Sequence, residues 1–188
     1  VWNGLTDKFH PTQMLADMLT VEENFGHLKG LKLTFFGDAR NNVANSLMVV
    51  CAKLGLHFTA CGPASLMPEE QLVKECRAIA AENEGSITLT EDIEKGAKDA
   101  DVLYTDIWVS MGEPESMMTM ANPHAIFLHC LPSFHDRLTT IGEDIYQKFG
   151  LSEMEVADGV FESRQSKVFD QAENRMHTIK AVMFATLS

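Results

Sequence analysis

A carboxylate stands where an apolar run of the sequence ends. Segment 101–112 begins with a short apolar stretch and then carries Asp106, a hydroxyl and a thioether before a glycine. This pattern is typical of a buried parallel strand that delivers a ligand-binding loop. Ligands of open α/β sheets bind beyond the carboxyl ends of the strands, so Asp106 is well placed to hold a cationic substrate. The alternative is that Asp106 caps a helix or accepts a hydrogen bond from a loop amide.

Polar residues also crowd the start of the first expected helix. His10, Thr12 and Gln13 surround Pro11, and proline tolerates the first helical position because no N–H donor is needed there. The free N–H groups and the dipole of a helix favour an anion at its N-terminus. These residues could therefore contact an anionic ligand. A capping role for Thr12 and a solvated His10 remain the alternative.

The turn after Gly37 continues Asp-Ala-Arg-Asn-Asn and lacks the glycine-rich fingerprint of a dinucleotide site. Side-chain amides, rather than bare backbone amides, line this turn. That composition favours a small polar ligand over a pyrophosphate. Asn41 or Asn42 could instead serve only as the N-cap of the next helix.

The sequence His-Cys-Leu-Pro stands at 129–132, and His135 follows shortly after it. Such residues can bind zinc, but two histidines and one thiol with no second half-site are too few for a structural zinc site, so we expect no metal. The other cysteines have neither the spacing of a metal site nor the density of a disulfide scaffold. We expect them in the core: Cys51, Cys61 and Cys76.

Arg175 lies in the first turn of the last expected helix, 171–187. Asp170 is the expected N-cap of that helix, and Glu173 completes a capping box. A cation at a helix N-terminus is electrostatically disfavoured, so Arg175 indicates an anion or a carbonyl group to be held there. The alternative is a surface ion pair between Arg175 and a nearby glutamate.

Strands and helices are expected to alternate along the chain. Apolar runs bounded by turn residues predict strands in the first half of segment 101–112 and at 31–36, 56–61, 87–90, 125–129 and 155–156. Apolar residues at helical spacing predict helices at 11–25, 42–54, 69–82, 91–98, 140–149 and 171–187. The alternation predicts an α/β fold, a doubly wound parallel sheet flanked by helices.

The composition is that of an acidic globular protein. The 188 residues carry a net charge of −12, with 45% hydrophobic and 22% charged residues. This charge argues against nucleic acid or an anionic membrane surface as a partner, since both reward clustered Lys and Arg. No apolar run approaches a membrane span and no signal segment opens the chain, so we expect a cytoplasmic protein. Because the sequence begins at Val1 and not at a methionine, we expect a piece of a longer protein.

Four of these segments are motifs: His-Pro-Thr-Gln at 10–13, Asp-x-Trp-x-Ser-Met-Gly at 106–112, His-Cys-Leu-Pro at 129–132 and Glu-Asn-Arg-Met-His-Thr at 173–178. Together they resemble the signatures of the carbamoyltransferases, and within that family those of the ornithine carbamoyltransferases. Aspartate carbamoyltransferases share the first motif but lack the Ser-Met-Gly and His-Cys-Leu-Pro pair. The resemblance covers essentially the whole chain and implies a Rossmann-like second domain.

The resemblance implies that residues 1–188 are a single ornithine-binding domain, with helices at 10–25 and 171–187 joining it to a carbamoyl-phosphate domain. That other domain carries a Ser-Thr-Arg-Thr-Arg phosphate cradle, which is absent from this chain. Family members are trimers or multiples of trimers. They usually have a longer loop after the Ser-Met-Gly motif, where only 113–124 stand here, so we expect this lid to be shortened or partly unrepresented.

Carried over by motif position, one set of residues holds L-ornithine. Asp106 and Asn42 take its α-amino and carboxylate end, and Ser110 and Met111 fix its chain. The functional class this implies is a carbamoyltransferase that transfers the carbamoyl group of carbamoyl phosphate to the δ-amine of ornithine.

A second set holds carbamoyl phosphate. His10 and Arg175 hydrogen-bond its carbonyl oxygen, where negative charge grows in the transition state. Gln13 and the backbone carbonyls of Cys130 and Leu131 hold the carbamoyl NH₂ group. The other members of the first motif are also expected to bind substrate: Pro11 and Thr12.

The implied reaction is acyl transfer, in which the neutral δ-amine attacks the carbamoyl carbon, phosphate leaves and L-citrulline results. Alignment of two substrates and fixed donors supplies most of the rate, so no cofactor or metal is expected. Cys130 is expected to orient the amine, because no base and oxyanion arrangement for thioester chemistry is evident. The rival hypotheses are a catalytically silent ornithine-binding or regulatory module, which would have no use for the carbamoyl-side residues, and a nicotinamide-dependent oxidoreductase, which would need the missing glycine fingerprint.

Overall fold

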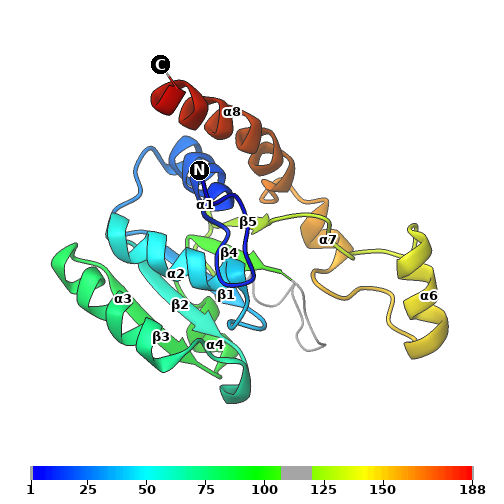
Figure 1. Cartoon of the computed structure of the whole chain (residues 1–188). Coiled ribbons are helices and arrows are strands. Elements are labelled where there is room, and N and C mark those ends of the chain that lie inside the picture. The colour runs from blue at the N-terminus through cyan, green and yellow to red at the C-terminus, as the bar shows by residue number, and fades with distance from the viewer. Residues whose placement is uncertain (1, 107–119, 188) are drawn as a thin grey trace.

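The computed structural model describes residues 2–106 and 120–187, and its centre is one parallel β-sheet (Figure 1). The five strands lie in the order β3-β2-β1-β4-β5, and all neighbours pair in parallel. Their bounds are Lys32–Phe36 for β1, His57–Cys61 for β2, Ser86–Thr90 for β3, Val102–Thr105 for β4 and Ile126–His129 for β5. The predicted doubly wound parallel sheet is confirmed.

Helices cover both faces of the sheet. One core joins the first face to α1 (Pro11–Phe25), α2 (Asn42–Leu54) and α3 (Glu70–Glu82). A second core joins the other face to α4 (Ile93–Ala97), α7 (Asp158–Phe161) and the start of α8 (Val168–Leu187). A 3₁₀ turn, η1 (Ala64–Leu66), follows β2, and α6 (Thr140–Phe149) stands apart from the body of the domain (Figure 1).

The apolar residues of each strand divide between the two cores. Phe35 packs into the first core and Phe36 into the second, because successive side chains of a strand point to opposite faces. Tyr104 and Leu103 on β4 divide in the same way. Burial of each large apolar side chain contributes roughly 1.5–3 kcal/mol, which is why central strands of this sheet are apolar on both faces.

Local signals set the ends of several helices. α1 begins with Pro11 and ends at Gly26, whose φ of 76° is left-handed. Asn41 is the N-cap of α2, since its side chain accepts a hydrogen bond from Ala44 N. The expected bounds of α1, α2 and α6 are confirmed to the residue.

The strand order reverses between β1 and β4. In doubly wound sheets this switch point opens a crevice at the carboxyl ends of the strands. The turns there pack closely: Gly37 N donates to Cys61 O at 3.1 Å, and a Cβ on Gly62 would lie 2.5 Å from Gly37 O. The segments that follow β1 and β4 carry Asn41 and Asp106 into this region.

One strand predicted in the last third of the chain is not formed. No strand forms at 155–156; Glu155 and Val156 are buried loop residues, and β5 gains only an isolated bridge between Phe127 and Ser166. Helix α7 follows this loop and packs Val160 and Phe161 into the second core, and sequence periodicity did not predict it because the helix is only four residues long.

The last helix begins earlier than expected. α8 starts at Val168, a fully buried residue of the second core, and Lys167 N donates to Phe127 O at 2.9 Å just before it. Tertiary packing therefore fixes the start, so Asp170 is a helical residue and the predicted capping box is wrong. Arg175 consequently lies beyond the first turn of α8.

Helices α1 and α8 pack together at one end of the molecule, and α8 projects beyond the rest of the domain (Figure 1). Met14 and Met18 of α1 are buried, but Leu15 is 43% exposed. On α8, Met176 is 56% and Met183 is 45% exposed. The two helices thus bury one side against the sheet and each other and leave apolar side chains on the other. Within the described chain, no helix combines the length and the apolar character needed to cross a membrane.

Candidate active site

The carboxylate of Asp106 is the centre of a hydrogen-bonded cluster at the switch point. Asp106 is 8% exposed and directly follows β4. The Cys130 thiol donates to its Oδ1 at 3.2 Å, and Asn41 Nδ2 donates to its Oδ2 at 3.1 Å. Both partners are neutral, and no cation pairs with Asp106 in the described part of the chain. A buried carboxylate in this state has the capacity to bind a cationic group.

Cys130 is held as a protonated thiol. Burial raises the pKa of Cys130, and the negative charge of Asp106 and its hydrogen bond raise it further. A thiolate is the nucleophilic form of cysteine, so this environment disfavours covalent chemistry at Cys130. The other three cysteines are buried, as expected.

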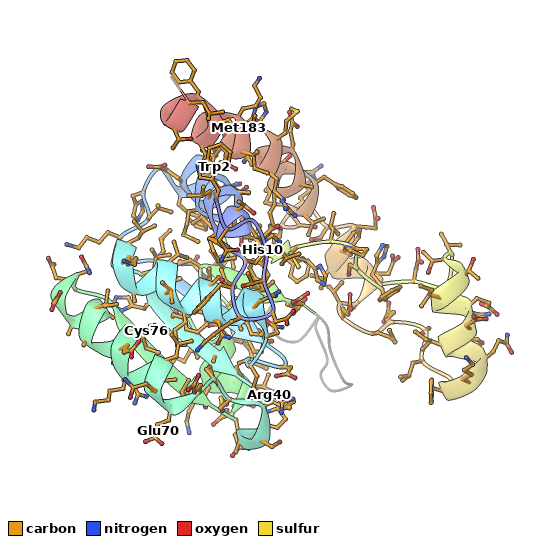
Figure 2. All side chains as sticks on the ribbon, in the orientation of Figure 1. Trp2, His10, Arg40, Glu70, Cys76 and Met183 are labelled. Carbon is orange, nitrogen blue, oxygen red and sulfur yellow. The ribbon has the colours of Figure 1, made fainter. Side chains whose placement is uncertain are left out.

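His10 precedes α1 and is 7% exposed; Figure 2 shows it at that end of the helix. Its backbone N–H donates to Ser46 Oγ at 2.8 Å, and ring atom Nδ1 lies 2.9 Å from Gly4 O. A carbonyl oxygen can only accept, so Nδ1 carries the proton and Nε2 of the neutral ring is an acceptor. Burial lowers the pKa of His10; Gly4 O opposes this, Arg175 adds to it and Asp106 opposes it.

Gln13 is tied into a buried polar network beneath this site. Its Nε2 donates to Asp17 Oδ1 at 2.7 Å, whereas its Oε1 is buried and has no hydrogen-bond partner in the described residues. Gln171 Nε2 donates to Asp17 Oδ1 at 2.6 Å and to Tyr104 Oη at 3.0 Å. The network joins α1, α8 and β4. Burial raises the pKa of Asp17 to about 7, against the hydrogen bonds from Gln171, Gln13 and Tyr104, which lower it.

Arg175 extends from α8 toward the same end of α1. Its charge lowers the pKa of both His10 and Asp17, which places it within electrostatic reach of both. Across residues 2–106 and 120–187, its guanidinium forms no hydrogen bond or ion pair with a side chain. The surface ion pair considered from the sequence is therefore not formed there.

The backbone after β5 turns sharply at Leu131. Its φ of 41° is in the left-handed region, and the Leu131–Pro132 peptide is cis. Leu131 N donates to His129 Nδ1 at 3.1 Å, and His129 N donates to Gln171 Oε1 at 3.0 Å. These contacts hold the Cys130–Leu131 segment beside Asp106.

Other expected site residues have different contacts. Asn42 Nδ2 donates to Thr6 O at 2.9 Å and not to Asp106; the amide that reaches Asp106 belongs to Asn41. Thr12 Oγ1 donates to Gly4 O at 2.8 Å and α1 has no side-chain cap, so the alternative capping role of Thr12 is not observed. Pro11 occupies the first turn of α1 as expected. Ser110 and Met111 lie outside the described residues.

Several residues of the site had no clear signal in the sequence. The sequence leaves Asn41 as one of the amides that line the turn or as an N-cap, and in the structure it both caps α2 through Oδ1 and donates to Asp106 through Nδ2. Gln13 and Asp17 are four residues apart, so a spacing of about one helical turn was the signal in the sequence for the contact between them. The contacts of Gln171 and Glu155 depend on segments far apart in sequence and could not be found from local spacing.

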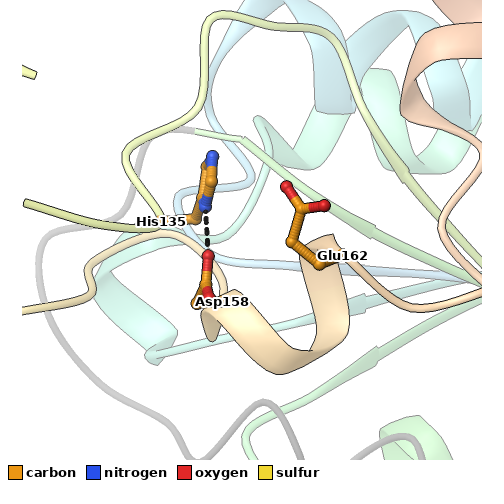
Figure 3. A group of neighbouring side chains, drawn as sticks. All are labelled: His135, Asp158 and Glu162. Carbon is orange, nitrogen blue, oxygen red and sulfur yellow. Dashed lines mark hydrogen bonds and ion pairs between the residues drawn. The ribbon is translucent and has the colours of Figure 1, made fainter. Parts of the chain in front are cut away.

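His135, Asp158 and Glu162 form the one candidate metal-ligand group in the described part of the chain (Figure 3). Their donor atoms all lie within 4.8 Å of one another. His135 Nδ1 is 2.9 Å from Asp158 Oδ1, and the ring stacks on Phe161 with centroids 3.7 Å apart. The hydrogen bond and the stacking already account for the position of His135 as a link between the loop after β5 and α7.

Known proteins are similar to this chain in both sequence and fold. Residues 29–186 match the family described as "Aspartate/ornithine carbamoyltransferase, Asp/Orn binding domain". A catabolic ornithine carbamoyltransferase of Treponema denticola is 63% identical over 100% of this chain and 60% of its own length. One from Bacillus licheniformis is 54% identical over 100% of this chain and 61% of its own length. The alignments extend over 204 positions, so these relatives contain positions that this chain lacks.

Two solved structures agree. Ornithine carbamoyltransferase from Gloeobacter violaceus superposes with a TM-score of 0.83 at 36% identity, over 96% of this chain and 60% of that one. Ornithine carbamoyltransferase from Pyrococcus furiosus superposes with a TM-score of 0.81 at 40% identity, over 96% of this chain and 57% of that one. The chain thus spans about 60% of the length of the relatives it matches. On its sequence and its fold, the chain belongs to the aspartate/ornithine carbamoyltransferase family, in which it corresponds to the Asp/Orn-binding domain.

Proposed function

We propose that this chain supplies the ornithine-binding half of an ornithine carbamoyltransferase. The enzyme transfers the carbamoyl group of carbamoyl phosphate to the δ-amine of L-ornithine and forms L-citrulline and phosphate. The observation that carries the proposal is the cluster of Asp106, Cys130 and Asn41 at the switch point of the sheet. The Treponema denticola and Bacillus licheniformis relatives align with the whole of this chain, and both carry the name of this enzyme.

The charge of Asp106 supports an amino-acid substrate. Its carboxylate is buried, and its hydrogen-bond partners among the described residues, the Cys130 thiol and the Asn41 amide, are neutral. The α-ammonium group of ornithine would supply the missing positive charge, and Asn42 would have to release Thr6 O to bind the carboxylate. Ser110 and Met111 would fix the aliphatic chain of the substrate. The protonated Cys130 then acts as an orienting group next to the amine.

The side-chain oxygen of Gln13, which has no hydrogen-bond partner among the described residues, supports a second ligand. Gln13 is 1% exposed, and Asp17 accepts from its amide nitrogen, so the buried Oε1 remains as an acceptor. A carbamoyl NH₂ group is a donor of the right kind for this oxygen. The backbone carbonyls of Cys130 and Leu131 would accept its remaining N–H. Pro11 and Thr12 complete this wall of the site.

His10 and Arg175 would stabilise the carbonyl oxygen of carbamoyl phosphate as negative charge develops on it. Arg175 has no partner of its own in the described chain and is free to donate. His10 can donate through Nε2 only when the ring is protonated or when Nδ1 gives up its bond to Gly4 O. Binding of carbamoyl phosphate therefore has to break the Gly4 contact or add a proton to His10.

The phosphate itself would be held by a carbamoyl-phosphate domain that this chain does not contain. The exposed apolar side chains of α1 and α8 are suited to contact that domain. A cavity of about 410 Å³ lined by Phe9, Pro11 and Met14 adds to the apolar surface beside α1. A trimer or a multiple of trimers, a cytoplasmic location and a place in arginine metabolism complete the proposal. The names of three relatives favour the catabolic direction over arginine biosynthesis.

The proposal is tested by completing the enzyme. The part of the Treponema denticola relative that this chain does not cover is fused to the chain, and citrulline is measured with both substrates present. The chain alone is the control. Citrulline formation by the fusion and none by the chain alone is the expected result. Ornithine binding by the fusion without turnover would instead favour a silent ornithine-binding module.

A further inference from the structure

Glu155 and His129 form a buried pair beside the proposed site. His129 Nε2 lies 3.2 Å from Glu155 Oε2, and the exposed fractions of the two side chains are 1% and 3%. The N–H of Nε2 does not point straight at the oxygen, so the contact is a close approach of two polar groups without an ideal hydrogen bond. Burying a carboxylate costs several kcal/mol unless nearby groups compensate, so a pair this deep requires an explanation.

The contacts of the His129 ring determine which nitrogen carries its proton. Leu131 N donates to Nδ1 at 3.1 Å, so Nδ1 is an acceptor and cannot be protonated. A neutral ring with a bare Nδ1 must carry its proton on Nε2, which faces Glu155 Oε2. The carboxylate therefore selects the tautomer in which Nδ1 is available to Leu131.

Glu155 also holds the far end of the same loop. Its Oε2 accepts from Phe134 N at 2.9 Å, and Glu155 N donates to Phe134 O at 3.3 Å. One carboxylate oxygen thus faces both His129 and Phe134, the residues that bracket the turn. Between them, Leu131 keeps a left-handed φ of 41°, which a leucine adopts only when its surroundings enforce it.

We propose that Glu155 and His129 are positioning residues: Glu155 holds His129 as the Nε2–H tautomer, and His129 Nδ1 holds the backbone of Leu131 so that the carbonyls of Cys130 and Leu131 face the carbamoyl group. The inference rests on the proposed function, because it explains how those two carbonyls are presented. Neither residue contacts a substrate in this account.

The tautomer is measured on the 188-residue chain by ¹⁵N NMR of the histidine rings, with His129 assigned by its loss in His129→Gln. The expected spectrum shows protonated Nε2 and bare Nδ1. Glu155→Gln can keep one oxygen facing both His129 and Phe134, and it should preserve this tautomer. Glu155→Leu should lose it. A His129 protonated on Nδ1 in the wild-type chain would overturn the proposal.

Turnover is measured in the fusion described above. Glu155→Leu should lower kcat on the order of tenfold to a hundredfold with little change in ornithine KM, since misplaced binding groups cost about that much. Glu155→Gln should restore most of the rate. Glu153→Leu is the matched control, because Glu153 accepts from Asp158 N at 2.9 Å in the same loop without reaching His129.

A second pair of variants, at His129, tests the proposal even if Glu155→Leu does not fold. His129→Asn leaves an acceptor near the position of Nδ1, whereas His129→Gln places its amide near that of Nε2. Higher turnover in His129→Asn than in His129→Gln is expected; equal turnover in the two would overturn the role of Nδ1. No citrulline from the unmutated fusion would count against the proposed function instead, and the NMR result would still decide the tautomer.

Discussion

The Cys130 thiol donates a hydrogen bond to Asp106 Oδ1 at 3.2 Å and so joins the ends of β4 and β5. Burial and this contact both raise the pKa of the thiol and keep the sulfur protonated, and the contact fixes one oxygen of the carboxylate. The other oxygen is fixed by Asn41. The carboxylate is therefore held in one orientation before any substrate arrives, which lowers the entropic cost of binding a cation there.

Cys130→Ser should weaken the enzyme without abolishing it. A hydroxyl can still donate to Asp106, so the expected loss in kcat/KM for ornithine in the fusion is about 0.5–1.5 kcal/mol, and Cys130→Ala should lose more, about 1.5–3 kcal/mol. Steady-state citrulline assays measure both. Complete loss of turnover in Cys130→Ser and Cys130→Ala alike, with both variants folded, would indicate a covalent role for the thiol.

Arg175→Gln should raise the pKa of His10. The positive charge of Arg175 lowers that pKa in the native chain, so its removal favours the protonated ring. NMR titration of the isolated chain gives the value directly. Arg164→Gln, at an exposed arginine ahead of α8, is the control and should leave His10 unchanged. An identical His10 titration in wild type and Arg175→Gln would show that the charge of Arg175 does not act on His10.

In the fusion, Arg175→Ala and His10→Ala should lower kcat more than they raise either KM. The charge on the carbonyl oxygen is largest in the transition state, so a donor to that oxygen acts mostly there. Initial rates at varied concentrations of both substrates measure the division. Raised KM values with an unchanged kcat in both variants would show that these residues do not stabilise the carbonyl oxygen in the transition state.

Asp17 should make the stability of the chain depend on pH. Its pKa rises on folding from 3.8 to about 7, so between these values the native state binds more protons than the unfolded state. The free energy of unfolding therefore falls as pH rises through this window, by at most about 4 kcal/mol, and the loss is complete above the folded pKa.

Asp17→Asn isolates this contribution. The asparagine can keep Oδ1 as the acceptor for Gln13 and Gln171, and it cannot ionise. Urea unfolding at pH 5 and pH 8 should show that the stability of Asp17→Asn relative to wild type increases with pH. A difference that is constant, or that shrinks toward pH 8, would show that Asp17 does not carry a raised pKa.

The sequence predicted the sheet and most helices because those elements depend on local signals. Pro11 and Gly26 define α1, and glycine ends α2 and α6 in the same way. Tertiary packing decided the remainder. Val168 begins α8 because it is buried in the second core, and Glu155 is buried because it faces His129. Neither contact can be predicted from the spacing of residues in the sequence.

The site was predicted in part for the same reason. The end of an apolar run indicated Asp106 and the family resemblance indicated Cys130, and the structure brings the two into contact. Spacing could not tell which neighbouring asparagine reaches the carboxylate, since Asn41 and Asn42 point in different directions from the start of one helix. The tautomer of His10 could not be predicted either, because it is set by Gly4 O.

The isolated chain should self-associate through α1 and α8. Leu15, Met176 and Met183 are exposed apolar side chains on these helices, and we assign that surface to contact with the proposed carbamoyl-phosphate domain. Sedimentation velocity and binding of a hydrophobic dye measure the effect. Met176→Glu combined with Met183→Glu should reduce both, whereas Leu138→Glu, at a residue before α6 that is 92% exposed, is the control. A monomeric, dye-negative wild-type chain would contradict this assignment.

The most direct test of the proposed ornithine site is calorimetric titration of the fusion carrying Asp106→Asn with each substrate. The substitution keeps the size of the side chain and removes the charge that would pair with the ornithine ammonium group. Ornithine binding should weaken by about 2–5 kcal/mol, the usual effect of removing one half of a buried charge pair, while carbamoyl phosphate binding stays nearly unchanged. Equal losses for the two substrates, or unchanged ornithine binding, would contradict the account of Asp106 as the centre of the amino-acid pocket.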